Sequence, residues 1–170
     1  MYNAITGDEN AWDDHGHGTH VSATICGVGN NLHGISGVDQ TCEIVAVKFL
    51  TSNGGGSTFD AIKGIDYAIE QGVSIINASW GGGGYSEPLR NAIGRANDAS
   101  ILFVAAAGNS GVNNDISPHY PSSYNVSNII SVASIDESGE KSSFSNYGTE
   151  SVDIAAPGRG ILSAKYTGGS

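Results

Sequence analysis

The chain has 170 residues, which is enough for one domain of ordinary size with a hydrophobic core. With 39% hydrophobic and 14% charged residues, its composition is that of a globular protein and not of a disordered segment. The net charge of −10 argues against a nucleic-acid partner, because a phosphate backbone attracts cationic surfaces. The longest apolar run, Ile101 to Ala107, is far shorter than the roughly 20 residues of a membrane-spanning helix, so we expect no membrane partner.

The N-terminal residues and the cysteines are where the sequence would show signs of the cellular location of the protein. Met1 to Trp12 is polar and acidic and lacks the apolar core of a signal peptide. The two cysteines, Cys26 and Cys42, are too few for a disulfide scaffold and leave the redox compartment open. The 25 glycines are about twice the usual share, which predicts many tight turns or close backbone approaches.

The first half of the chain contains one predicted strand and one predicted helix. Residues 43–50 are rich in β-branched side chains and predict a buried strand. Apolar residues then recur at helical spacing, at Phe59, Ile62, Ile65 and Ile69. Ser57 with Asp60 three residues later resembles a capping box, and Gly72 suits the end of this helix.

The second half alternates strands and a helix. Residues 73–78, 101–107 and 128–134 predict strands, and the helix between the first two shows one apolar face, at Leu89, Ala92, Ile93 and Ala96. Ser86 is a suitable N-cap for this helix and Pro88 suits its first turn. Continuous apolar strands separated by helices predict an α/β domain with a doubly wound, mostly parallel sheet and helices on both faces.

Ligands of such sheets bind beyond the carboxyl ends of the strands. The loops that follow Ala78 and Ala107 are therefore the places to look for chemistry. Both loops consist mostly of small residues, Ser79-Trp80-Gly81-Gly82 and Gly108-Asn109-Ser110-Gly111.

A second candidate is a histidine cluster, because three of the five histidines lie close together at His15, His17 and His20. This spacing is similar to the metallo-β-lactamase pattern, but that pattern needs an Asp where Thr19 stands. The other interpretation is a general base at a helix N-terminus, where the helix dipole favours the neutral imidazole.

Ordered motifs over nearly the whole chain resemble those of the subtilisin-like serine proteases. The histidine motif of that family is similar to residues 16–21, its substrate-binding segment to residues 79–81 and its oxyanion-hole segment to residues 105–111. Residues 153–158 resemble the stretch that leads toward the serine motif of the family. The resemblance implies that residues 1–170 are part of a subtilisin-like peptidase domain that is incomplete at both ends.

The resemblance also implies roles for single residues. His17 would be the general base that takes the proton of a serine hydroxyl, and the Asn109 amide would donate a hydrogen bond to the oxyanion. A peptide or protein substrate would lie as an extended strand along Ser79, Trp80 and Gly81, with Ala107 and Gly108 also in contact with it.

The family further implies a calcium loop at residues 29–35, with Asn31 as a ligand, although a plain turn explains the same residues. No cofactor for catalysis is implied, and the complete protein would be an extracellular monomer. The resemblance also implies a cis bond between Tyr120 and Pro121, where members of the family carry one.

The chain departs from the family at two members of the Asp-His-Ser triad. No Asp-Thr-Gly or Asp-Ser-Gly motif precedes His17, and no Gly-Thr-Ser-Met-Ala motif follows Gly158. We therefore expect part of a serine endopeptidase whose 170 residues alone are inactive. The alternatives are a non-catalytic relative that binds peptides and a metal-dependent hydrolase built on His15, His17 and His20.

Overall fold

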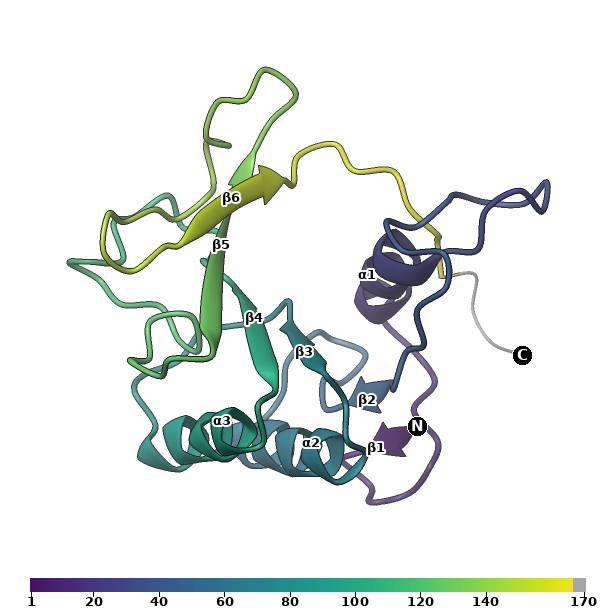
Figure 1. Cartoon of the computed structure of the whole chain (residues 1–170), viewed down its shortest axis with the longest axis horizontal. Coiled ribbons are helices and arrows are strands. Elements are labelled where there is room, and N and C mark those ends of the chain that lie inside the picture. Colours follow the sequence, from purple (N-terminus) through teal and green to yellow (C-terminus); the bar gives the residue numbers. More distant parts are fainter. Residues whose placement is uncertain (167–170) are drawn as a thin grey trace. The chain divides into compact units, whose positions relative to one another are not determined.

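The computed structural model describes residues 1–166, whose backbone forms two compact units (Figure 1). The first unit consists of residues 1–71 and the segment that begins at Leu162, and the second consists of residues 72–161. No helix among the described residues has the length and apolar character needed to cross a membrane.

The first unit contains a short parallel strand pair and two helices. Strand β1 (Tyr2–Asn3) pairs with β2 (Val47–Lys48), and helix α2 (Thr58–Glu70) packs against both strands. Helix α1 (His17–Cys26) carries the histidine motif. The capping prediction for α2 is confirmed, because Ser57 Oγ accepts a hydrogen bond from the Asp60 backbone N–H at 3.0 Å.

The buried face of α2 includes Ile65 but otherwise consists of small residues. Its buried residues are Ala61, Gly64, Ile65 and Ala68, whereas Phe59 is 69% exposed. A Cβ atom on Gly64 would lie 2.8 Å from Val47 Cγ1, so the helix packs against β2 through its small residues. The spacing of the large apolar residues thus located the helix correctly.

The strand predicted at residues 43–50 is confirmed only at Val47–Lys48. Its partner β1 is equally short, because the chain turns immediately after it, with the Gly7 N–H donating to the Asn3 carbonyl. A strand extends only as far as a neighbour pairs with it, so the β-branched composition of residues 43–46 was not sufficient to make them part of the strand.

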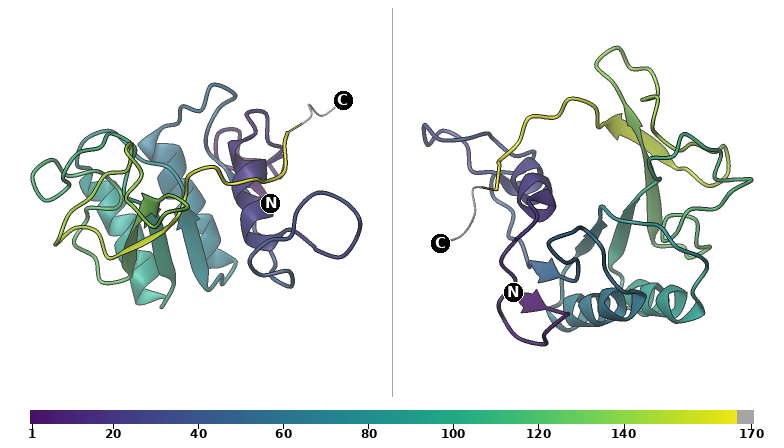
Figure 2. Two further views of the ribbon diagram at one scale, coloured as in Figure 1. Left: turned by 90° about the horizontal axis from the view of Figure 1, so that it is seen from above. Right: turned by 180° about the vertical axis from the view of Figure 1, so that it is seen from behind.

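The second unit is built on a parallel sheet in the order β3-β4-β5-β6 (Figures 1 and 2). The strands are β3 (Ile75–Ala78), β4 (Leu102–Ala106), β5 (Ile129–Ile135) and β6 (Ile154–Pro157). Helix α3 (Glu87–Asp98) connects β3 to β4 and packs against β4 through the four apolar residues predicted for its buried face. Ser86 caps this helix and Pro88 lies in its first turn, as predicted.

Strand β6 was not predicted as a strand, because the sequence analysis used residues 153–158 only as a motif. It pairs with β5 over Val132↔Ile154 to Ile135↔Pro157, and it holds the edge position that tolerates a proline. The Asp153 carboxylate accepts a hydrogen bond from the Ser131 N–H at 2.7 Å just before β6 begins.

Candidate functional site

The histidine motif begins helix α1 directly. Gly16 is the N-cap residue and adopts φ 102°, a conformation that favours glycine, so no capping side chain is available at that position. Asp13 supplies the cap instead: its Oδ2 accepts hydrogen bonds from the Thr19 N–H at 2.7 Å and the Thr19 hydroxyl at 2.6 Å. Its Oδ1 accepts from the N–H groups of His15 and Gly16 at 2.9 and 2.8 Å. His17 is therefore the first residue of a helix whose start is fixed by one carboxylate.

These hydrogen bonds determine the charge of Asp13. Partial burial raises the pKa of this carboxyl, but hydrogen bonds from the Thr19 hydroxyl and from the N–H groups of Gly16, His15 and Thr19 outweigh burial. The net effect holds the pKa of Asp13 well below its usual range. Asp13 is thus a stable negative charge at the positive end of the α1 dipole. No role for Asp13 was predicted from the sequence.

The histidine cluster does not form a metal site. Within residues 1–166, the structure contains no group of three or more His, Cys, Asp or Glu side chains that could hold a metal ion. The rings of His15 and His17 meet edge to face, with their centroids 6.5 Å apart. His15 and His20 instead line a cavity of about 320 Å³, together with Gly16 and residues 163–166. The metal-dependent hydrolase therefore has no support in the described residues.

In the second unit, the two predicted substrate-binding segments begin at the carboxyl ends of two neighbouring strands, β3 and β4. Ala78 pairs with Ala105 in the parallel register of β3 and β4, so both strands end side by side. Ser79, Trp80 and Gly81 follow β3 directly, and Ala107 and Gly108 follow β4. Trp80 is half-buried, while Ala107 is fully buried.

His119 lies against both of these segments. A Cβ atom on Gly81 would collide with the His119 ring, and one on Gly108 would lie 2.9 Å from its Cδ2 atom. Burial lowers the pKa of this imidazole and so favours its neutral form. Its Nδ1 lies 3.3 Å from Ser122 Oγ. No sequence motif surrounds His119, because contact with two glycines that are distant in sequence leaves no local pattern.

Asn109 is exposed in the loop that follows β4. Gly108 and Gly111, on either side, adopt φ angles of 113° and 68°. A turn in which both of these residues have positive φ requires glycine or an equally tolerant residue. Asn109 thus lies in the loop that leaves the end of β4, next to the end of β3 from which residues 79–81 continue. The cis Tyr120–Pro121 bond, also in this unit, is confirmed.

The predicted calcium loop lies in the first unit as an exposed turn. Asn31 Oδ1 accepts a hydrogen bond from the His33 N–H at 3.0 Å, and Asn30 and Leu32 have positive φ angles of 59° and 63°. Residues 29–35 contain no carboxylate, so this loop by itself offers only neutral amide and carbonyl oxygens. These are acceptable calcium ligands, but calcium usually also takes a carboxylate.

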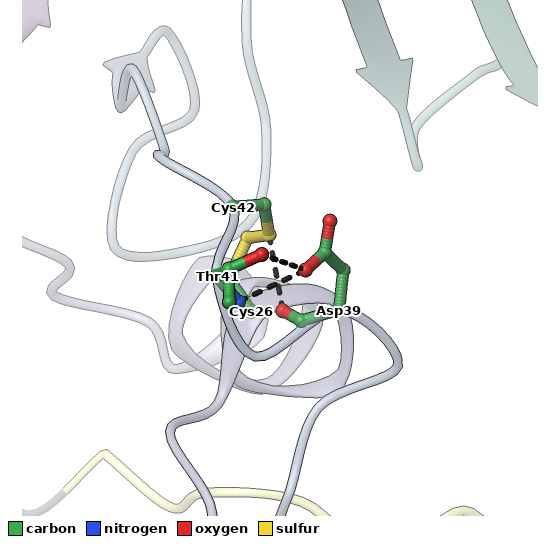
Figure 3. The surroundings of a disulfide bond; sticks show 4 residues. All are labelled: Cys26, Asp39, Thr41 and Cys42. Carbon is green, nitrogen blue, oxygen red and sulfur yellow. Dashed lines mark hydrogen bonds between the residues drawn. A yellow bond between two sulfur atoms is a disulfide. The ribbon is translucent and has the colours of Figure 1, made fainter.

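A disulfide joins Cys26, the last residue of α1, to Cys42, with the Cα atoms 5.6 Å apart (Figure 3). Beside it, Asp39 Oδ1 accepts hydrogen bonds from the N–H and hydroxyl of Thr41, which lower the pKa of that carboxyl. The structure thus answers the question of redox state that the sequence left open.

Comparison with known proteins defines first the fold and then the family. A crystal structure of a cold-adapted subtilisin-like serine proteinase superposes with a TM-score of 0.84 at 35% identity, over 96% of this chain and 56% of that one. The predicted doubly wound α/β fold is therefore confirmed as subtilisin-like. The family model of peptidase S8 matches residues 1–170, and the chain belongs to the subtilase family of serine peptidases.

Two curated relatives support this membership. A thermostable alkaline protease of Halalkalibacterium halodurans is 42% identical over 164 residues, which cover 96% of this chain and 43% of the relative. Thermitase of Thermoactinomyces vulgaris is 40% identical over 163 residues, which cover 96% of this chain and 56% of the relative. The chain thus spans about half the length of these relatives.

Proposed function

We propose that residues 1–170 carry the general base and the oxyanion-hole donor of a serine endopeptidase. The observation that supports this most is that β3 and β4 end side by side, so that the loop with Asn109 and the backbone of residues 79–81 leave neighbouring strand ends. The family relationship supplies the reaction class, which is peptide-bond hydrolysis by a serine nucleophile.

In the proposed mechanism, the backbone of Ser79, Trp80 and Gly81 pairs with an extended peptide, which places the scissile carbonyl near Asn109. His17 removes the proton from the serine hydroxyl as it attacks and then delivers that proton to the leaving amine. As the tetrahedral intermediate forms, the Asn109 side-chain amide donates a hydrogen bond to its oxyanion. The nucleophilic serine and the aspartate that orients His17 match no segment of residues 1–170, so another part of the enzyme must supply them.

A fluorophosphonate probe tests the dependence on outside residues. We expect the purified 170-residue chain to show no labelled serine and no hydrolysis of a chromogenic peptide. The product of the complete reading frame that encodes these residues, called here the complete enzyme, should be labelled and active. Labelling of the short chain would contradict the proposal, and a complete enzyme that binds peptides without hydrolysing them would indicate the non-catalytic relative.

Substitutions in the complete enzyme test the two roles. His17→Ala should lower kcat by about six orders of magnitude, the loss measured for the corresponding residue of subtilisin. Asn109→Ala should lower kcat by about 10²–10³-fold, again the range measured in subtilisin, with little change in KM. Ser110→Ala is the matched control for Asn109, because it changes an exposed side chain in the same loop and keeps the backbone.

We also propose an extracellular location and a structural calcium ion near Asn31. The Cys26–Cys42 disulfide supports the location, because disulfides persist in oxidising compartments. Calcium at Asn31 would need a carboxylate from outside residues 29–35. A chelator should lower the melting temperature of the complete enzyme, and Asn31→Ala should abolish that response.

A further inference from the structure

Two buried asparagines underlie the Asn109 loop. Asn114 and Asn146 are each 1% exposed, which is rare for amide side chains unless they are hydrogen-bonded. Asn146 Nδ2 donates to Asn114 Oδ1 at 3.0 Å, and Asn114 Nδ2 donates to the Ala107 carbonyl at 2.8 Å. The pair therefore links residue 146 to the end of β4.

Asn146 also holds the loop beyond Asn109. Its Oδ1 accepts hydrogen bonds from the N–H groups of Ser110 at 2.8 Å and Val112 at 3.4 Å. Its own backbone N–H donates to the Gly108 carbonyl at 2.9 Å. Asn109 is thus flanked on both sides by residues that Asn146 binds directly.

Neighbouring backbone bonds extend this contact. The Gly111 N–H donates to the Phe144 carbonyl at 2.8 Å, and the Asn114 N–H donates to the Tyr147 carbonyl at 2.7 Å. Residues 144–147 therefore hold the loop through hydrogen bonds that reach from Gly108 to Asn114.

The loop needs this support because, within the described residues, the Asn109 side chain makes no hydrogen bond that would hold it in place. This side chain is also exposed. Glycine at position 108 leaves the preceding backbone conformationally free. The placement of the Asn109 amide therefore depends on the backbone, and an error of about 1 Å at a catalytic group can cost about 100-fold in rate.

We propose that Asn146, together with Asn114, is a positioning residue for the oxyanion-hole donor. This inference rests on the proposed function of Asn109. The buried amide pair holds Gly108 and Ser110 at fixed positions, so that the Asn109 side chain reaches the developing oxyanion without rearrangement. A Cβ atom on Gly108 would collide with Asn146 Nδ2, which shows how closely the two residues pack.

The test uses the complete enzyme, with kcat expressed per active site titrated by the fluorophosphonate, so that misfolded molecules are not counted. Asn146→Ala should lower kcat by roughly 10- to 100-fold while KM stays within about twofold. Asn146→Asp is nearly isosteric, and the active-site titration leaves out any molecules that its buried carboxylate prevents from folding. It keeps the acceptor for Ser110 but replaces the donor to Asn114, so we expect a smaller loss of kcat.

Asn128→Ala is the matched control. Asn128 is 8% exposed, and its Nδ2 donates to the Ile101 carbonyl at 2.8 Å, the same kind of bond at the opposite end of β4. This variant should lose stability and keep its kcat.

The double variant Asn109→Ala/Asn146→Ala gives the decisive readout. If Asn146 acts through Asn109, the double variant has the kcat of Asn109→Ala alone, because the positioned group is already absent. Losses that multiply, or an unchanged kcat in both Asn146 variants, would overturn the positioning role while leaving the proposed function intact. An unchanged kcat in Asn109→Ala would overturn the proposed function of Asn109 and the inference with it.

Discussion

The carboxylate of Asp13 fixes the start of the helix that carries His17, and its removal should therefore weaken that helix. Asp13→Ala leaves the N–H groups of Thr19 and Gly16 without their acceptor. We expect a loss of about 1 kcal/mol in the free energy of unfolding of the complete enzyme, measured by urea denaturation at pH 7. Asp14→Ala is the control, because Asp14 is exposed and its partner Lys48 keeps a hydrogen bond to the Leu50 carbonyl.

The contribution of Asp13 should also depend on pH. Because the folded-state pKa lies below the unfolded value, this stabilisation is complete above the ordinary carboxyl pKa near 4 and is lost as pH falls through the lowered value. The stability difference between the wild type and Asp13→Ala should therefore be constant from pH 5 to 7 and shrink below pH 4. A difference that grew on acidification would contradict the assignment.

His119 allows a second residue-level prediction. Gly81→Ala places a methyl group against the half-buried His119 ring and should destabilise the complete enzyme by about 1–3 kcal/mol, as overpacking does. His119→Ala removes the obstacle, so the double variant should be less destabilised than the sum of the single variants. Additive effects in urea denaturation would show that the two residues do not touch.

Among the helices and strands, local sequence signals were sufficient to predict where helices α2 and α3 begin. Ser57 and Ser86 cap α2 and α3 as their sequence positions predicted, because a cap depends on residues within one turn. The pairing of β1 with β2 was missed, since it joins residues 45 positions apart, at Tyr2 and Val47. Strand β6 was missed for the same reason, because its identity depends on pairing with β5.

A single carboxylate also joins two loops of the second unit. Asp115 accepts hydrogen bonds from the Ser151 hydroxyl at 2.6 Å and from the Thr149 and Ser151 N–H groups at 2.8 and 2.9 Å. The Ser151 hydroxyl and these N–H groups, with that of Glu150, lower the pKa of Asp115 to about 2 despite an opposing effect of desolvation. The loop that follows β4 is thereby held to residues 149–151.

Asp115→Asn should therefore reduce the loss of the free energy of unfolding that occurs as the pH falls into the acid range. The lowered pKa means that the stabilisation is complete above pH 4 and is lost as pH falls toward 2. We expect the wild type to be more stable than the variant at pH 6 and the two to converge as the pH approaches 2, measured by urea denaturation. Asp98→Asn is the control, because it makes the same change of residue type at an exposed position at the end of α3.

For the whole molecule, the sequence predicted the residues that form local motifs and missed those that support them. His17, Asn109 and the 79–81 segment could be predicted because the family motifs are contiguous. Asp13, His119 and Asn146 were missed, since each acts through contacts with residues that no short pattern includes. For the same reason, the sequence did not show whether Cys26 and Cys42 form a disulfide, because their proximity appears only once the chain has folded.

The Cys26–Cys42 disulfide yields the last prediction. It links the end of α1 to a residue 16 positions later, and closing a loop of this size contributes about 3 kcal/mol, mainly by restricting the unfolded chain. Replacing both cysteines by serine should lower the free energy of unfolding by about this amount, and a reducing agent should have the same effect on the wild type. The serine variant is its own control, because the reductant should not change its stability. Two free thiols in the complete enzyme purified without reductant would contradict both the disulfide and the extracellular location that it supports.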